Sequence, residues 1–251
     1  MAKPIPVTAK LVRKLQLTSD VIELHFAPEP EFDFLPGQFM SIVIPGAGPG
    51  GRDLRRAYSI ASAPENKIIE LCVKVVEGGP GTQYLNGLRL GDSIKANTPF
   101  GDFVYKPAAG RAAMMIATGT GIAPFRSMIL SKVYQDQKPT QTHLLFGARE
   151  AGDLLYTESL TAALGPKGFI QALSRPKPQD QWNGFKGRVT DYLREQATQI
   201  PWSETEFYLC GNGAMIDEVK QILSAHAVEK SAIHQEVYYK PKPGETHASQ
   251  T

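Results

Sequence analysis

The sequence predicts a two-domain protein, an antiparallel β-barrel followed by a doubly wound α/β domain with a parallel sheet. Up to about Lys106, short apolar segments alternate with Gly/Pro turns, a pattern typical of an antiparallel barrel or sandwich. From about Ala112, apolar runs alternate with amphipathic segments, which indicates a parallel sheet covered by helices on both faces. The segment KPAAG, residues 106–110, has linker chemistry. We therefore expect domains at residues 1–107 and 108–239, and a polar, disordered tail at 240–251.

The individual elements follow from the same two patterns. In the first domain, the predicted strands are residues 10–18, 21–28, 39–45, 57–62, 67–76 and 92–105. A helical insertion, QYLNGL at 83–88, interrupts this series directly after GGPGT. In the second domain, the predicted strands are 114–118, 143–148, 168–174 and 207–211, and the predicted helices are 124–135, 156–164, 188–196 and 214–227.

The bulk composition excludes several classes of protein. The 251 residues carry a net charge of +2, from 27 basic and 25 acidic residues, which gives no reason to expect nucleic-acid or general membrane binding. The beginning, MAKPIPVTAK, lacks the apolar core of a signal peptide, and no apolar run approaches the length of a membrane span. Two cysteines are too few for a plant-type iron–sulfur cluster or a disulfide framework. We expect a cytoplasmic monomer without a metal site.

The stretch RRAYSIASAP, residues 55–64, has an unusual composition for a strand. With a period of two, Arg56, Tyr58 and Ile60 point to one face. A core face does not normally place a charge beside an aromatic ring. This pattern raises the question of what lies against that face.

Three glycine-rich loops each follow an apolar strand. GGPGT at 78–82 leads into the helical insertion, where Thr82 either caps the helix or donates its hydroxyl to a phosphate. ATGTGIAPF at 117–125 resembles a dinucleotide fingerprint, with GxGxxP in place of GxGxxG. CGNG at 210–213 repeats the layout late in the domain. Cys210 is either an inert core thiol or a ligand-facing group at the strand end.

Taken together, the motifs resemble the ferredoxin–NADP reductase family of flavoproteins. RxYS at 56–59, GGPGT, GTGIAP at 119–124, CGNG and EVYY at 236–239 occur in the order of that family, over nearly the whole chain. The resemblance implies a two-domain reductase without its own iron–sulfur domain, with FAD and NADPH as cofactors and NADH as the less expected nucleotide.

The resemblance also assigns roles around the flavin. Arg56 would pair with the pyrophosphate of FAD, Tyr58 would stack on the isoalloxazine ring, and Ser59 would hydrogen-bond near flavin N5. The full set of implied FAD contacts is Arg56, Ala57, Tyr58, Ser59, Cys72, Val73, Lys74, Gly79, Gly81 and Thr82.

On the nicotinamide side, the resemblance places Cys210 beside the nicotinamide, Glu236 as an assisting carboxylate and Tyr238 over the other flavin face. Ser59, Cys210 and Glu236 are the implied catalytic residues. The remaining implied contacts are Thr118, Gly119, Thr120, Gly121, Pro124, Arg149, Ser174, Arg175, Arg188, Gly211 and Asn212. The serine and the three arginines would hold the 2′-phosphate of NADPH.

Several functions stay open at this stage. The first is a ferredoxin or flavodoxin reductase, and the second is a reductase component of an oxygenase or a free-flavin reductase. The segment SRPKPQDQW, residues 174–182, slightly favours the second. A third is an accessory flavin subunit of a larger complex, but the cysteine cluster of such subunits is missing. A basic face for an acidic carrier could comprise Lys10, Arg13, Lys14, Arg52 and Arg55, and an ordinary solvated face explains these residues as well.

Overall fold

A computed structural model describes residues 3–239, and these fall into two compact units. Unit 1 contains the chain up to Pro107 together with Ala123–Gln137. Unit 2 contains Ala108–Ile122 and the chain from Lys138 onward. The predicted boundary between 107 and 108 stays a prediction, and the predicted tail at 240–251 lies outside the described residues.

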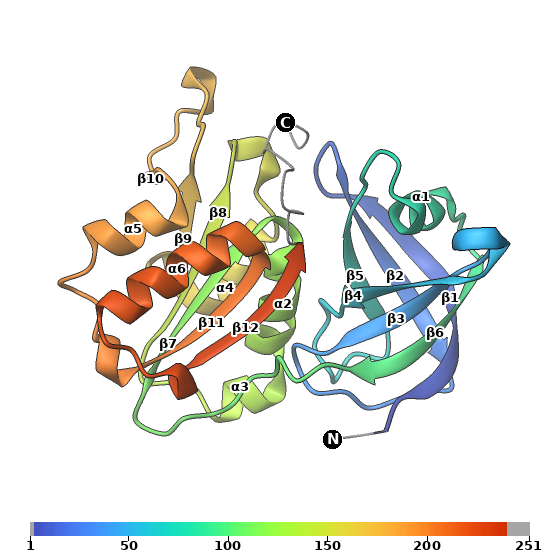
Figure 1. The fold of residues 1–251 in the computed structure, drawn as a ribbon, viewed down its shortest axis with the longest axis horizontal. Helices are drawn as coiled ribbons and strands as arrows, with labels where there is room; N and C mark the ends of the chain where they lie inside the picture. Colours follow the sequence, from blue (N-terminus) through green and yellow to red (C-terminus); the bar gives the residue numbers. More distant parts are fainter. Residues whose placement is uncertain (1–2, 240–251) are drawn as a thin grey trace. The chain divides into compact units, whose positions relative to one another are not determined.

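Unit 1 is built on a six-stranded antiparallel sheet with the order β4-β3-β6-β1-β2-β5. The strands are β1 (Ile5–Gln16), β2 (Val21–Glu29), β3 (Phe39–Ile44), β4 (Leu54–Ser59), β5 (Ile69–Lys74) and β6 (Ser93–Phe100). The two edge strands approach each other at a bridge between Ile60 and Leu71, which closes the sheet into a barrel. Helix α1 (Pro80–Gly87) lies at one end of this barrel (Figure 1).

The alternation of the strands explains the barrel. In β3, buried Met40, Ile42 and Ile44 alternate with less buried residues, so that one face of the strand joins the core. Strand β2 places Ile22, Leu24 and Phe26 in the same core, and its other face carries polar residues that matter below.

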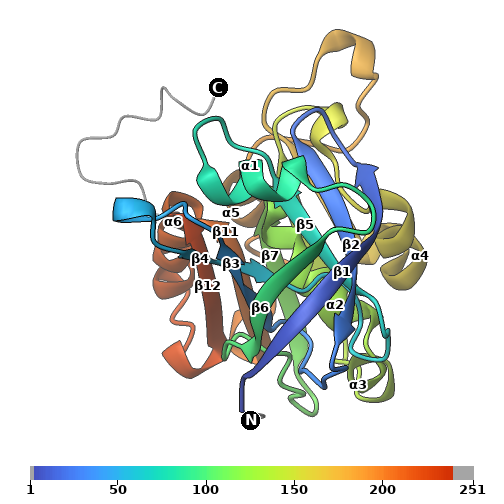
Figure 2. The same cartoon turned by 90° about the vertical axis from the view of Figure 1, so that its right-hand side faces the viewer.

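Unit 2 contains a six-stranded parallel sheet with the order β10-β9-β8-β7-β11-β12. Its strands are β7 (Ala112–Thr118), β8 (Thr142–Ala148), β9 (Phe169–Leu173), β10 (Phe185–Lys186), β11 (Thr205–Asn212) and β12 (Ile233–Tyr239). Helices α5 (Val189–Glu195) and α6 (Gly213–Ala225) lie on one face, and α4 (Thr157–Gly168) lies on the other (Figures 1 and 2). The predicted fold class is therefore confirmed.

The order of the strands reverses beside β7. From β7 the chain proceeds through β8, β9 and β10 in one direction, and it then returns to place β11 and β12 on the other side of β7. In doubly wound sheets, ligands bind outside the carboxyl ends of the strands at such a reversal. The glycine loops after β7 and β11 lie at this position.

Some elements differ from the sequence predictions. The segment predicted as one helix at 124–135 forms two, α2 (Ala123–Leu130) and α3 (Lys132–Asp136). Ser131 ends the first helix by donating its hydroxyl to Met128 O, and it caps the second by accepting a hydrogen bond from Tyr134 N. The sequence patterns did not predict β10 and β12, because β10 has two residues and β12 has three consecutive polar residues after Ile233.

Helices α2 and α3 pack against residues of unit 1. The rings of Phe125 and Phe103 meet edge to face with centroids 5.7 Å apart, and those of Tyr134 and Tyr105 do so at 5.4 Å. The hydroxyl of Tyr105 also donates to Gln137 O at 2.6 Å. Among residues 3–239, no helix is both long and apolar enough to cross a lipid bilayer.

Candidate cofactor-binding site

The structure brings the RxYS segment and the GGPGT loop together. Gly81, in the first turn of α1, is buried against β4: a methyl group on it would lie 2.8 Å from Tyr58 Oη and 2.9 Å from Arg56 Cγ. Tyr58 is half-buried and packs on the barrel core, whereas Arg56 is exposed. Burial raises the pKa of Tyr58 to about 12, although the charge of Arg56 lowers it, so the phenol stays protonated at neutral pH. A neutral ring and a cation therefore share one surface.

The start of α1 is suited to an anion. Its N-cap, Gly79, provides no side-chain hydrogen bond to the helix, so in the described chain the first backbone N–H groups have no side-chain cap. Such N–H groups bind phosphate readily. The hydroxyl of Thr82 donates to Gly79 O at 3.1 Å and accepts from Val76 N at 3.1 Å, so it stabilises the loop. Because Thr82 is the third residue of the helix, it is not the N-cap.

The edges of the barrel provide the other predicted flavin contacts. Strands β4 and β5 are the two edge strands of the sheet, and they come together at Ile60 and Leu71. Ser59 is buried next to this bridge, at the end of β4. Cys72 and Val73 follow on β5 and are also buried, whereas Lys74 is exposed and pairs with Asp20 at 2.9 Å. The two sets predicted from the sequence therefore lie on the two strands that meet where the barrel closes.

At the carboxyl ends of β7 and β11, two glycine loops interlock. A methyl group on Gly121 would lie 2.5 Å from Cys210 O and 2.7 Å from Gly211 Cα. Thr118 Oγ1 accepts a hydrogen bond from Asn212 N at 3.3 Å, and Asn212 caps α6 by accepting from Ala214 N at 2.8 Å. These loops therefore hold Thr118, Gly121, Gly211 and Asn212 together.

The other predicted residues of the first loop have different environments. Gly119 is exposed and has φ of +55°, a conformation that favours glycine. Thr120 is half-buried in the short 3-10 helix Gly119–Ile122, and Pro124 is buried as the second residue of α2.

Cys210, Glu236 and Tyr238 also come together within unit 2. Cys210 and Glu236 are register partners on the neighbouring parallel strands β11 and β12. Burial raises the pKa of the Cys210 thiol well above its usual value, and the Glu236 carboxylate acts in the same direction, whereas a hydrogen bond with Tyr238 lowers it. Cys210 is fully buried and Tyr238 is 39% exposed. A neutral thiol therefore has both a carboxylate and a phenol as interaction partners.

A group of cations lies at the ends of β8 and β9. Ser174 N donates to Ala148 O at 3.0 Å, and Arg175 N donates to Arg149 O at 2.8 Å, so both arginines belong to adjoining strand ends. Arg188 is the N-cap of α5, and the preceding Gly187 N donates to Leu173 O at 2.8 Å. Arg149, Ser174, Arg175 and Arg188 are all exposed.

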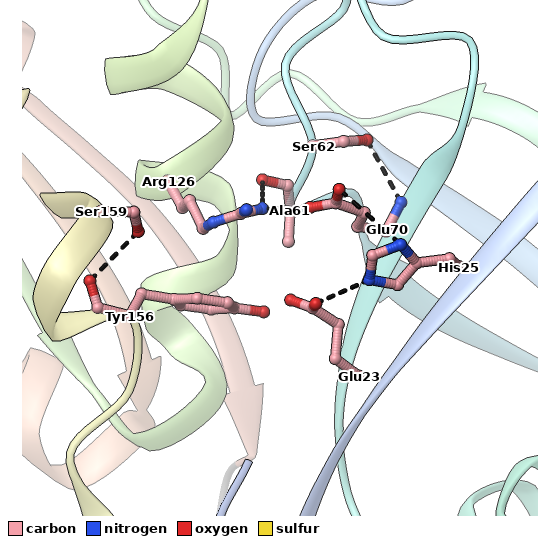
Figure 3. Close-up of polar contacts among 8 residues, drawn as sticks. All are labelled: Glu23, His25, Ala61, Ser62, Glu70, Arg126, Tyr156 and Ser159. Carbon is pink, nitrogen blue, oxygen red and sulfur yellow. Dashed lines mark hydrogen bonds and ion pairs between the residues drawn. The ribbon is translucent and has the colours of Figure 1, made fainter. Parts of the chain in front are cut away.

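Sequence reasoning missed two features near these positions. Lys177 forms an ion pair with Glu150, and this raises the pKa of the lysine. In unit 1, Arg126 forms an ion pair with Glu70, close to His25 and Glu23 (Figure 3). Because these partners are far apart in the sequence, no local motif indicates them. The available signal was the alternation of apolar and polar residues in β2 and β5, which puts Glu23, His25 and Glu70 outside the apolar core face.

Comparison with known proteins finds matches to both parts of the chain. Residues 8–105 match the family model of the oxidoreductase FAD-binding domain, and residues 115–221 match that of the oxidoreductase NAD-binding domain. The chain is 33% identical to "Ferredoxin--NADP reductase B" of Sorangium cellulosum, over 95% of this chain and 100% of that protein. The chain belongs to the ferredoxin–NADP reductase-like family. As an FAD- and NAD(P)-dependent oxidoreductase of this family, it has the two cofactors that the sequence motifs imply.

Proteins that serve as electron transfer components of oxygenases are also similar to this chain. The chain is 27% identical to the "Xylene/toluene monooxygenase electron transfer component XylA" of Pseudomonas putida, over 96% of this chain and 67% of that protein. The fold matches a ferredoxin–NADP⁺ reductase from Neisseria gonorrhoeae with bound FAD and NADP, with a TM-score of 0.80 at 21% identity over 95% of this chain and 100% of that chain.

Proposed function

We propose that the protein transfers electrons between NADPH and a one-electron carrier, a ferredoxin or a flavodoxin. The observation that carries this proposal is the similarity to "Ferredoxin--NADP reductase B" along the full length of that relative. The exposed arginines at the ends of β8 and β9 support the choice of NADPH.

The residues of unit 1 fit FAD by their chemistry. Arg56 and the uncapped start of α1 provide a cation and free N–H groups for the pyrophosphate. Tyr58 offers a neutral aromatic surface for the isoalloxazine ring, and Ser59 offers a hydroxyl at the closing edge of the barrel. When bound, FAD supplies the ability to accept a hydride and to release its two electrons one at a time.

The residues of unit 2 would bind and orient the nicotinamide nucleotide. The interlocked loops at 118–121 and 210–212 lie at the reversal of the sheet, where a dinucleotide binds. Cys210 is fully buried beside Tyr238, so it would contact the nicotinamide as a neutral thiol once the Tyr238 side chain moves aside. Glu236 and Tyr238 would hold the thiol in place.

The preference for NADPH depends on the charge around its 2′-phosphate. Arg149 and Arg175 are joined through their backbones, and Arg188 stands at the start of α5 beyond β10. Several carboxylates lie near these cations: Glu150 is paired with Lys177, Asp153 and Asp180 lie near the same lysine, and Asp191 accepts a hydrogen bond from Arg188 N at 2.8 Å. The exposed side chains of Arg149, Arg175 and Arg188 would provide the cations for the 2′-phosphate.

A second candidate function is a reductase component of an oxygenase system. The similarity to the electron transfer component XylA favours it, although the chain spans about two thirds of that protein. The segment 174–182 also supports it, because the Pro–Trp run after Ser174 resembles that of oxygenase reductases.

One experiment distinguishes the two functions. Cytochrome c reduction is measured with and without added ferredoxin or flavodoxin, using NADPH and NADH in parallel. The proposed function predicts a strong stimulation by the carrier and a preference for NADPH of at least about tenfold. An NADH preference without stimulation by either carrier would favour the oxygenase component.

A further inference from the structure

A nearly buried arginine connects the two edge strands of the barrel. Arg126, on α2, donates a hydrogen bond to Ala61 O at 2.9 Å and forms an ion pair with Glu70 on β5 (Figure 3). The Arg126 and Glu70 side chains are 15% and 13% exposed. A guanidinium with little solvent must be held by its protein partners, because leaving it unpaired is costly.

The partners of Arg126 are themselves tied together. Ala61 N donates to Glu70 O at 2.8 Å, and Glu70 N donates to Ser62 Oγ at 3.2 Å. Arg126 therefore contacts a junction that begins two residues after Ser59 and ends two residues before Cys72. Both of these residues belong to the proposed flavin contacts.

Two further side chains complete the cluster from β2. His25 Nε2 lies 2.7 Å from Glu23 Oε1, and His25 Nδ1 lies 3.9 Å from Glu70 Oε1. In the register of the sheet, His25 faces Glu70 and Glu23 faces Cys72. The cluster thus extends along β5 toward the strand segment that we assign to the flavin.

The three groups Glu23, His25 and Glu70 have their ligand atoms within 4.8 Å of one another, the spacing of a cation site. However, Glu70 is already paired with Arg126, and the His25 ring is already hydrogen-bonded to Glu23. A metal ion would have to compete with a guanidinium for the same carboxylate, so we interpret the cluster as a charge-compensated support.

Arg126 lies on the helix that directly follows the proposed nucleotide loop in the chain. The glycine loop at 119–122 runs directly into α2, which starts at Ala123. The helix that begins at the proposed nucleotide loop therefore carries the side chain that holds the junction of the barrel edges.

We propose that Arg126 is a positioning residue for the flavin, holding the 59–62 segment and β5 in the spacing that hydride transfer requires. This inference rests on the proposed flavin contacts, and it is independent of the electron acceptor. Displacing a reacting group by about 1 Å can cost about a hundredfold in rate, so a partial loosening of the junction should be measurable.

The test compares three variants of the full-length holoprotein with the wild type. Arg126→Met removes the guanidinium, Arg126→Lys keeps the charge, and Glu70→Gln weakens the ion pair at nearly constant volume. Flavin reduction by NADPH is followed by stopped flow at 450 nm, and turnover is measured with ferricyanide, which needs no protein carrier.

Arg111→Met is the matched control. Arg111 also contacts a carboxylate and two backbone carbonyls, namely Glu206, Ser203 O at 3.0 Å and Thr205 O at 3.1 Å. These groups lie at the amino ends of β7 and β11, opposite the glycine loops. A general effect of losing a connected arginine should appear in this control.

We expect Arg126→Met to lower the limiting rate of flavin reduction about tenfold and to change the visible spectrum of the flavin, while the Kd for NADPH changes less than threefold. Arg126→Lys should recover part of the rate, and Arg111→Met should lower Tm with a rate within twofold of wild type. A rate within twofold and an unchanged spectrum in Arg126→Met would overturn the proposal. If Arg126→Met does not retain FAD, the decision rests on Glu70→Gln. A reduction rate within twofold of wild type and an unchanged flavin spectrum in Glu70→Gln would then overturn the proposal. Failure of both ferredoxin and flavodoxin to accept electrons would contradict the proposed function and leave the role of Arg126 unaffected.

Discussion

Replacing Gly121 by alanine should disturb the contact between the two glycine loops of unit 2. The added methyl group would lie 2.5 Å from Cys210 O and 2.7 Å from Gly211 Cα, whereas real Cβ atoms essentially never come closer than 3.0 Å to such atoms. Because the neighbours are backbone atoms, they cannot rotate away as a side chain would. One of the two loops must therefore move by about 0.5 Å.

The size of the effect follows from this displacement. Overpacking of this kind costs about 1–3 kcal/mol of unfolding free energy, which corresponds to a fall in Tm of roughly 2–12 °C for a chain of this size. If a misplacement of 1 Å costs about a hundredfold in rate, half of it costs about tenfold. We therefore expect Gly121→Ala to slow hydride transfer about tenfold at saturating NADPH, with FAD retained.

The measurement combines thermal melting with stopped-flow reduction of the flavin. Gly168→Ala is the control, because its methyl group would lie 2.9 Å from Leu164 Cβ and 3.3 Å from Thr142 O, at the amino end of β9. That variant should lose stability but keep its rate. A wild-type Tm and a rate within twofold in Gly121→Ala would refute the reasoning, since the loops would then have room for a methyl group.

The remaining predictions concern the three other parts of the site. Arg56→Ala should lose FAD on gel filtration, because a charge-assisted contact contributes about 1.5–3 kcal/mol, while turnover per bound flavin changes little; unchanged flavin content would contradict the phosphate role. Cys210→Ala should retain FAD and slow hydride transfer about tenfold, or ~1.4 kcal/mol, and an unchanged single-turnover rate would make Cys210 a packing residue. Because burial raises the pKa of this thiol, iodoacetamide at pH 8 should alkylate it far more slowly in the native than in the unfolded protein. Arg175→Ala should reduce the ratio of kcat/KM for NADPH over NADH about tenfold, and an unchanged ratio would show that the 2′-phosphate lies elsewhere.

The periodicity of the sequence predicts the fold because burial follows it directly. In β3, buried and less buried residues alternate, because one face of the strand is covered. In β7, nearly all residues are apolar and buried, because both faces are covered. The glycine loops are equally predictable, since the backbone at Gly121 and Gly211 comes too close to its neighbours for any side chain. These features depend on residues close together in the chain.

The missed features depend on residues far apart in the chain. Arg126 and Glu70 are separated by 56 positions, and nothing in either local segment indicates the other. The break at Ser131 was missed because a single serine inside an amphipathic run does not predict a new N-cap. The pair of Lys177 and Glu150 joins two loops whose proximity comes only from the parallel pairing of β8 and β9.

The packing of α2 and α3 on unit 1 limits how the protein can be recombined with its relatives. A chimera joined at residues 107 and 108 would import Phe125 and Tyr134 from one parent and Phe103 and Tyr105 from the other. Ring pairs of this kind fit only when both members keep their size and angle. Exchanges that keep 123–137 with the parental barrel, and replace 108–122 and the chain after 138, preserve every one of these contacts. In a chimera, α2 and α3 should therefore come from the same parent as the flavin barrel, although their sequence lies within the match to the NAD-binding domain.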